Sequence, residues 1–346
     1  MLIINSIPKS SYIKGFEWVG EQHGYPDPGV KGDTYPITWA ADDNLYTSAG
    51  DPLWGETTNG LDVEVIKGTS EDYIIEKINP MNDFLGWGGA GPKPTGMICV
   101  DNVLYLAVQN LRGMQFPSFG LNSQHGSDAG ILYCYSPGNW SPAFQNIKAP
   151  MFPGSKFGGP AFINFGKNNE NARDEYVYAV SGDQWDNGSN LRLGRVRADC
   201  ILRAESWEWV CAYDTDGTPV FWPKLDEAIP ILSIHQCVSA PDMAYVKGIN
   251  RYLLFTWRLH KDFSPDAGSD LIVMESPEPW GPFSLVHIEE NWESKEMNPY
   301  CPRLPLKWMD ADGTSGTLLF SGSWGPEAQA KKLYRAHTRK FRFLMA

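Results

Sequence analysis

The chain has 346 residues, of which 42% are hydrophobic and 20% are charged, and this balance excludes a disordered or fibrous protein. Its formal net charge of −12 argues against a nucleic-acid backbone as the main partner, and no apolar run is long enough to predict a membrane span. The 14 Trp, 34 Gly and 26 Pro combine flat apolar rings with many turn residues, which is typical of all-β proteins and of many sugar binders.

The N-terminal segment has no basic stretch followed by an apolar run, so the sequence predicts no secretory signal. The six cysteines form no CxxC pair, and most lie in apolar runs that read as strands. We therefore expect buried free thiols, although Cys200 and Cys211 flank a hairpin and are placed to form a disulfide in an oxidising compartment.

A degenerate repeat dominates the sequence, with a spacing of roughly 60 to 75 residues. Each unit is recognised by an apolar second strand, and these strands begin at Leu45, Leu104, Val177, Leu253 and Leu318. Turns rich in Asp, Asn and Gly connect each of them to an earlier apolar run, at 36–40, 95–100, 160–165, 242–246 and 303–308.

Two further strands are predicted in each unit. The third strands are expected at 61–66, 130–135, 191–197, 271–275 and 332–336. The fourth strands are expected at 73–78, 144–148, 207–213, 283–288 and 340–344. Five units of four antiparallel strands predict an all-β fold, a five-bladed β-propeller, and the alternative is a large sandwich with irregular loops.

The propeller is expected to form a single domain over residues 1–346. Its blades are predicted at approximately 32–80, 93–150, 156–214, 236–290 and 298–346. Residues 1–31 form an N-terminal extension or a closing strand, because 16–19 read as an outer strand. In such a ring, the loops before the first strands and those after the second strands share one face around the channel, where ligands generally bind.

Several carboxylates fall in the loops of this face. Asp51 and Asp183 hold equivalent places in blades one and three, each directly after a glycine, and Asp33 precedes the first strand. Two such groups across a channel can act as acid and base on a glycosidic bond. The alternative is that an Asp after a Gly caps its own loop. The predicted catalytic residues are Asp33, Asp51, Asp183 and His125.

Other side chains of these loops suit the binding of sugar. His125 lies in a long polar loop and is either a base or a surface residue. Indoles can stack on sugar rings, and the basic residues suit an anionic sugar such as a uronate. The predicted substrate-binding residues are Trp54, Lys93, Asp128, Lys156, Trp185, Gln236, Arg258, His260, Tyr300 and Trp324. No tight metal-ligand spacing appears, so no cofactor is expected, and Ca²⁺ or Na⁺ in the channel is the one ion considered.

Three stretches resemble β-propeller proteins of the domain-of-unknown-function 4185 group, namely 32–46, 162–167 followed by 176–178, and 250–254. The turn at 276–283 resembles one in five-bladed glycosidases of the arabinanase and xylosidase kind. The resemblance implies a carbohydrate-active five-bladed propeller, and members of known activity include endo-D-arabinanases, which are glycoside hydrolases.

The chain departs from the arabinanase and xylosidase families at the site. Those families use two Asp and one Glu near the starts of first strands, and here only Asp33 matches. The analogous places hold Lys93, Lys156 and Gln236, so the triad is not carried over. A second resemblance, at residues 39–43, is to rhamnose–glucuronate and ulvan lyases, whose propellers usually have seven blades and use His, Tyr and Arg.

The sequence therefore predicts a glycoside hydrolase in which Asp33, Asp51 and Asp183 share the acid, base and orienting roles. The alternative enzyme is a polysaccharide lyase, with His125 or Tyr300 as base beside a uronate. A third possibility is a propeller that binds sugar without cleaving it. The expected partner is a carbohydrate, with anionic sugars included, and the protein is expected to be a monomer without nucleic-acid or membrane partners.

Overall fold

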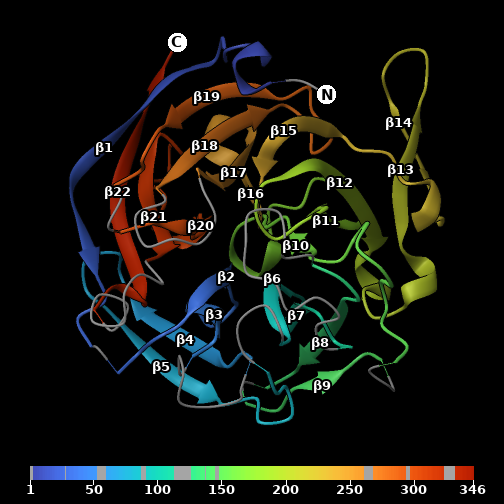
Figure 1. The fold of residues 1–346 in the computed structure, drawn as a ribbon, viewed down its shortest axis with the longest axis horizontal. Helices are drawn as coiled ribbons and strands as arrows, with labels where there is room; N and C mark the ends of the chain where they lie inside the picture. Colours follow the sequence, from blue (N-terminus) through green and yellow to red (C-terminus); the bar gives the residue numbers. More distant parts are fainter. Residues whose placement is uncertain are drawn as a thin grey trace.

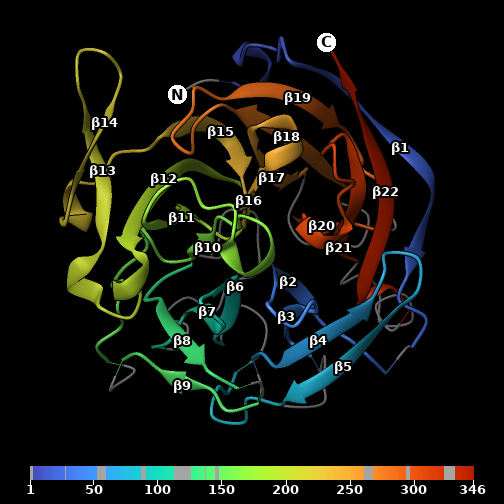
Figure 2. The same ribbon diagram turned by 180° about the vertical axis from the view of Figure 1, so that it is seen from behind.

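The structure is a computed structural model that describes residues 3–27, 29–52, 60–86, 91–112, 126–136, 138–144, 148–260, 268–293, 297–322 and 332–346. Its strands form five antiparallel sheets that stand around one axis (Figures 1 and 2). The chain is a five-bladed β-propeller, which confirms the predicted fold class. Within the described ranges, no helix is long and apolar enough to cross a membrane.

Blades one, two and four each have four strands in chain order, with the first strand innermost (Figure 1). Blade one contains β2 (Asp33–Trp39), β3 (Leu45–Gly50), β4 (Val63–Gly68) and β5 (Tyr73–Asn79). Blade two contains β6 (Lys93–Val100), β7 (Val103–Gln109), β8 (Gly130–Cys134) and β9 (Ser141–Pro142). Blade four contains β16 (Asp242–Val246), β17 (Arg251–Leu259), β18 (Ser269–Ser276) and β19 (Ser284–Glu289).

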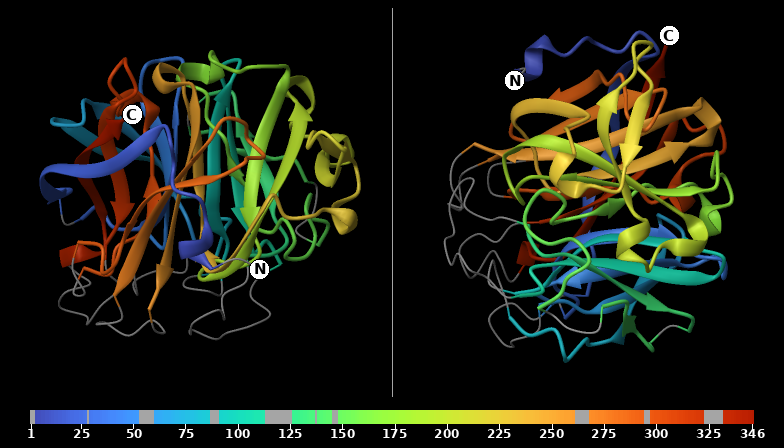
Figure 3. Two further views of the ribbon diagram at one scale, coloured as in Figure 1. Left: turned by 90° about the horizontal axis from the view of Figure 1, so that it is seen from above. Right: turned by 90° about the vertical axis from the view of Figure 1, so that its right-hand side faces the viewer.

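Blade three is larger than predicted. Its expected strands are β10 (Ala161–Phe162), β11 (Tyr176–Gly182), β12 (Gly188–Arg197) and β13 (Glu208–Tyr213). A further strand, β14 (Pro219–Trp222), pairs with β13 in a hairpin that projects from the side of the ring (Figures 1 and 3). Another, β15 (Leu232–Val238), pairs with the first half of β12, so residues 236–238, predicted to open blade four, belong to a strand of blade three.

Blade five joins the two ends of the chain. Its strands are β20 (Tyr300–Arg303), β21 (Ser315–Ser321), β22 (Ala336–Met345) and, outermost, β1 (Ile13–Gly24). The prediction of two strands at 332–336 and 340–344 is wrong. One strand, β22, continues through the polar residues between them, and it pairs with β21 from Ala336 to Arg342. The fourth strand comes from the N-terminus, so the expectation that 16–19 adds an outer strand is met by β1.

Two smaller strand predictions also differ from the structure. The sequence places the outer strand of blade two at 144–148, but the pairing with β8 occurs earlier, at the Ser-Pro step of β9. It places the inner strand of blade five at 303–308, but β20 ends at Arg303 and a 3-10 turn, η8 (Leu306–Trp308), follows Pro305. Proline lacks the backbone donor that a central strand needs, which explains the early end.

The core consists of apolar layers between neighbouring blades. In blade four, Leu254 and Ile272 pack toward blade three, whereas Leu253 and Val273 pack toward blade five. Both faces of a blade are therefore buried. This explains why the strands read as continuous apolar runs without alternation of polar residues.

Phe16 is expected to contribute most of the stability of the closing strand. It is buried in β1, and its ring stacks on Phe341 of β22 with centroids 5.1 Å apart. Phe16→Ala should lower the free energy of unfolding by about 3–5 kcal/mol, measured by urea denaturation. Val19→Ala in the same strand is the control, because Val19 is 44% exposed and should change the value by about 0.5 kcal/mol or less. Equal effects of the two substitutions would contradict this role.

Candidate functional site

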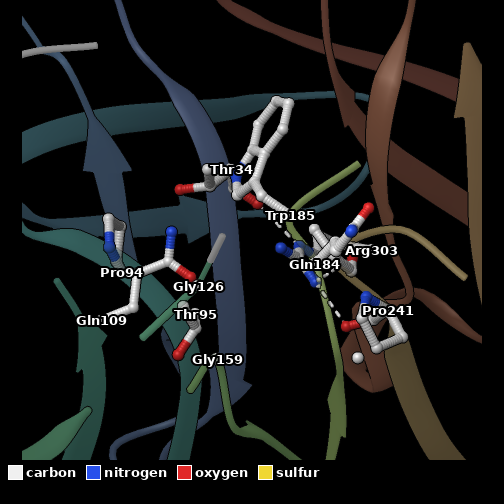
Figure 4. A pocket seen from close by; sticks show the side chains of 12 residues that line it. Thr34, Pro94, Thr95, Gln109, Gly126, Gly159, Gln184, Trp185, Pro241 and Arg303 are labelled. Carbon is white, nitrogen blue, oxygen red and sulfur yellow. Dashed lines mark hydrogen bonds between the residues drawn. The ribbon is translucent and has the colours of Figure 1, made fainter. Parts of the chain in front are cut away.

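The mouth of the central channel contains a pocket built by all five blades. About 360 Å³ of empty space, open solvent included, lies between residues of the loops expected to share one face. Its lining residues are Thr34, Pro94, Thr95, Gln109, Gly126, Gly159, Gly182, Gln184, Trp185, Ala240, Pro241 and Arg303 (Figure 4). The predicted convergence of loops from distant parts of the sequence is therefore present.

The inner strands are distorted where they reach this mouth. Register shifts occur in β2 between Thr34 and Ile37, in β6 between Pro94 and Gly96, and in β20 between Tyr300 and Arg303. Thr34 and Tyr35 have φ of 62° and 40°, and Cys301 has φ of 50°. Left-handed backbone at such residues costs roughly 1–3 kcal/mol each and clusters at functional sites. Bulges of this kind re-aim the neighbouring side chains, here Asp33 and Tyr300.

Asp33 and Asp51 lie on either side of Gly50 and are both buried. Asp33 pairs with Gly50 across β2 and β3, and its Oδ2 accepts a hydrogen bond of 2.9 Å from the Tyr300 hydroxyl. Its Oδ1 has no hydrogen-bond partner among the described residues. Asp51 forms an ion pair in which the Lys93 Nζ lies 2.7 Å from its Oδ1. The site thus holds one hydroxyl-bound carboxyl and one carboxyl neutralised by a lysine.

Burial controls the protonation of Asp33. Removal from water, followed by the nearby charge of Asp51, raises the pKa of Asp33 to about 7, although Lys93 and the hydroxyls of Tyr300 and Tyr334 oppose this. Desolvation disfavours a charged carboxylate, and a like charge nearby adds to that effect. Near neutral pH, Asp33 therefore holds its proton in a substantial part of the molecules, whereas the Lys93 ammonium compensates the charge of Asp51.

Gly50 allows the close approach of these groups. A Cβ atom at this position would lie 2.3 Å from the Asp33 Oδ1 and 3.4 Å from the Lys93 Cδ. The first distance is far below van der Waals contact, so any other residue would displace Asp33. The glycine before Asp51 is thus required by the site, beyond any role in a turn.

An aromatic wall stands beside the carboxyls. Trp185 lines the pocket, and its ring lies 5.2 Å from Trp257 and 5.8 Å from Tyr300, measured between centroids. Burial, followed by the Asp33 charge, raises the pKa of Tyr300 well above its usual value. Among the indoles that the structure describes, Trp185 is thus the predicted sugar-stacking residue that lines the pocket, and Tyr300 packs against it.

The two other predicted carboxylates accept hydrogen bonds from backbone N–H groups. Asp183 Oδ1 accepts from the backbone N–H of Ser189 and Asn190, and its Oδ2 accepts from the Asn190 amide. Asp128 Oδ1 accepts from the Gly154 N–H at 2.8 Å. Asp183 thus matches the alternative stated for an Asp after a Gly, in which the carboxylate caps its own loop, whereas Asp128 joins the start of β8 to the segment at Gly154. The equivalence of Asp51 and Asp183 in sequence therefore does not extend to their contacts.

The remaining polar candidates do not join Asp33 and Asp51. Lys156 Nζ donates to the Asp226 carbonyl oxygen. Gln236, with φ of 53°, lies in β15 and donates its N–H to the Ser189 Oγ. Arg258 and His260 both contact Asp270 in blade four. His125, Trp54 and Trp324 lie outside the described residues.

Sequence reasoning missed several residues of the mouth. Arg303 lines the pocket, is 1% exposed, and donates to the carbonyl oxygens of Thr34 and Pro241 at 2.6 and 3.0 Å (Figure 4). Its guanidinium also lies 3.8 Å from the buried Asp242. Tyr334 lies beside Asp33, and Gln184 has a buried Oε1 without a partner among the described residues. Of these residues, only Arg303 had a signal in the sequence, because an arginine begins the apolar run at 303–308.

No group of three His, Cys, Asp or Glu side chains could hold a metal ion in the part of the chain that the structure describes. The six cysteines are free, and Cys99, Cys134, Cys237 and Cys301 are buried. This agrees with the expectation for most of the thiols.

Comparisons with known proteins extend the description of the fold. No protein-family model and no curated protein matches the chain. The structure is similar to the Cellvibrio cellulosa alpha-L-arabinanase, at 14% identity and a TM-score of 0.52, over 92% of this chain and 96% of that one. It is also similar to the Podospora anserina alpha-L-arabinofuranosidase PaAbf62A, at 10% identity and a TM-score of 0.50, over 96% and 98%.

A third similar structure is a protein of unknown function from Dyadobacter fermentans, at 9% identity and a TM-score of 0.51, over 96% of this chain and 100% of that one. At these identities the likeness establishes the fold alone. Structural neighbours of this chain thus include glycoside hydrolases, and they share its architecture over almost the whole length.

The raised pKa of Asp33 predicts a pH-dependent stability difference between the wild type and Asp33→Asn. An unfolded Asp titrates at about 3.9, so between about pH 4 and pH 7 the unfolded chain releases a proton that the folded protein keeps. The wild type should therefore lose stability relative to Asp33→Asn as the pH rises, by up to about 4 kcal/mol in total. Urea denaturation of both proteins at pH 4.5 and pH 8 measures this. A difference that stays constant would refute the protonated buried carboxyl.

Proposed function

We propose that the protein is a glycoside hydrolase that cleaves a polysaccharide or oligosaccharide at the mouth of its channel. The observation that carries the proposal is the pair of buried carboxyls on either side of Gly50. Asp33 keeps a proton near pH 7, and Asp51 is held beside an ammonium group. Glycosidases require two carboxyls with different protonation states, one to donate a proton and one to accept a proton or stabilise positive charge.

The proposed roles follow from these environments. Asp33 is the general acid, because its Oδ1 has no partner among the described residues and its Oδ2 is already held by Tyr300. Asp51 acts as the second carboxylate, and Lys93 sets its position and charge. Trp185, in the wall of the pocket, supplies an apolar plane for a sugar ring. Asp183 holds its loop in this account and takes no part in the reaction.

The fold comparisons support the reaction class. An arabinanase and an arabinofuranosidase share this architecture, and both names describe enzymes that act on carbohydrate. Membership of the domain-of-unknown-function 4185 group is part of this proposal and rests on the short motifs at 32–46, 162–167 with 176–178, and 250–254.

The lyase alternative is less favoured by the geometry at Tyr300. A base must release its proton near the working pH, but burial raises the pKa of Tyr300 well above its usual value, and its hydroxyl donates to Asp33. Lyase products would show a new ultraviolet absorbance, whereas hydrolase products show new reducing ends alone. A propeller that only binds sugar would give neither signal.

Asp33→Asn and Asp51→Asn should each lower kcat by at least about 100-fold, because general acid and base groups contribute about 10² to 10⁴ in rate. The measurement is the release of reducing ends from a panel of arabinan, xylan and galactan, on the substrate that the wild type cleaves fastest. Asp312→Asn is the matched control, since Asp312 caps an exposed turn between β20 and β21. Wild-type turnover by both site variants would overturn the proposal.

The rate should also depend on pH in a defined direction. As the acid, Asp33 must be protonated, so kcat/KM should fall tenfold per pH unit once the pH exceeds about 7. A pH–rate profile between pH 5 and 9 tests this. A rate that rises steadily to pH 9 would exclude Asp33 as the proton donor.

A further inference from the structure

A second polar cluster lies in blade four, where β17 and β18 end. Asp270 is fully buried and accepts a hydrogen bond of 2.7 Å from Arg258 Nε and one of 3.0 Å from the Asn291 N–H. Its other contact is with His260 Nε2. One buried carboxylate therefore anchors two side chains that are both partly exposed, Arg258 at 27% and His260 at 29%.

The strand register produces this arrangement. Arg258 and Asp270 are direct partners across β17 and β18, and His260 follows one residue after β17 ends. Arg258 turns toward blade three, where its Nη1 lies 3.6 Å from the Cys237 Sγ. The guanidinium is thus fixed in orientation on two sides before any ligand arrives.

The cluster adjoins the pocket at the channel mouth. Leu259, between Arg258 and His260, donates its N–H to the Asn187 side chain at 2.7 Å and accepts from it at 2.8 Å. Asn187 belongs to the same blade-three loop as Trp185, which lines the pocket. Through this contact, the end of β17 that carries Arg258 and His260 is joined to the loop that carries Trp185.

The basic groups of the mouth differ in what they can offer to a ligand. Lys93 is paired with Asp51, and Arg303 is buried and bound to carbonyl oxygens. Arg258 is partly exposed, and its Nη2 makes no hydrogen bond to the residues that the structure describes. A planar guanidinium held by a buried carboxylate keeps its outer edge for a second anion, and carboxylates match that edge well.

We propose that Arg258 and His260 form a carboxylate-binding subsite that recognises a uronic acid residue in the sugar chain held at the mouth. The inference rests on the proposed function, since it assumes that the mouth binds carbohydrate, and it adds a charged sugar as the substrate class. Arg258 pairs with the carboxylate, and His260, whose Nε2–H donates to Asp270, supplies a second hydrogen bond from Nδ1–H in its imidazolium form. Asp270 is a positioning residue that touches neither the sugar nor the reacting bond.

The first test measures the binding of sodium glucuronate and of glucose to the wild-type protein. The readout is the shift of the imidazole resonances of His260 in a ¹H–¹³C spectrum. We expect glucuronate to bind at least about tenfold more tightly, which corresponds to about 1.4 kcal/mol. Glucose 6-sulfate is a third probe. Tighter binding of this sulfate than of glucuronate, or equal binding of glucose and glucuronate, would overturn the carboxylate assignment.

Variants assign the effect to Arg258. Arg258→Gln should remove the preference for glucuronate, and Arg258→Lys should keep part of it, because lysine retains the charge but loses the planar fork. Arg197→Gln is the matched control, since it removes the same charge from an exposed residue on the outer side of blade three. An unchanged preference in Arg258→Gln would refute the proposal.

The design stays decisive if Arg258→Gln fails to fold. In that case the wild-type spectrum decides: a shift of the His260 resonance with glucuronate and not with glucose supports the subsite, and no shift refutes it. The readouts also separate the two proposals. Glucuronate binding without cleavage of any polysaccharide would leave the subsite standing and refute the hydrolase, whereas cleavage without a glucuronate preference would refute the subsite alone.

Discussion

The antiparallel pairing of β1 with β22 is the contact on which the rest of this molecule depends. It joins residues more than three hundred positions apart, from Ile13 with Met345 to Gly24 with His337, and completes the fourth strand of blade five. A propeller blade buries both faces against its neighbours, so an open ring would expose two apolar faces at once. Closure therefore fixes the position of every inner strand, and with it the diameter of the channel.

The channel mouth uses that rigidity to hold groups that would be unfavourable elsewhere. Asp33, Asp51 and Lys93 are all nearly buried, and taking charges out of water is costly unless they are paired. The frame offsets this cost with one ion pair and a tyrosine hydroxyl, and burial raises the pKa of Asp33 to about 7. The left-handed backbone at Thr34, Tyr35 and Cys301 adds a further free-energy cost, and the packing of the surrounding strands compensates for it.

Blades one and four show how one architecture can carry two kinds of polar site. Around Gly50 one carboxyl is held by a hydroxyl and the other by an ammonium group, an arrangement that gives two neighbouring acids different protonation. Around Asp270 a buried acid is fully used by partners whose outer atoms remain available, an arrangement suited to recognition. The loop that carries Trp185 and Asn187 connects these two regions, so stacking and charge recognition would act on one sugar chain.

The sequence by itself determined the number of blades and the face on which the loops of all blades converge, because both follow from local patterns: apolar runs, turn residues and their spacing. It also pointed to Asp33, Asp51, Lys93 and Trp185, which the ring brings to the mouth or just behind it. It could not rank Asp51 above Asp183, since the same Gly-Asp step occurs at both. Contacts from Lys93 in one case and from Asn190 in the other decide their use.

Only the tertiary structure decided which strand closes blade five, which residues surround Asp33, and that Arg258 and His260 share Asp270. Each depends on contacts between segments far apart in the chain, such as Tyr300 with Asp33 or β1 with β22. Local composition carries no information about such pairs, because a buried partner is chosen by the register and curvature of the whole ring. The pKa of Asp33 belongs to the same class, since burial is its main cause and burial is a property of the assembled fold.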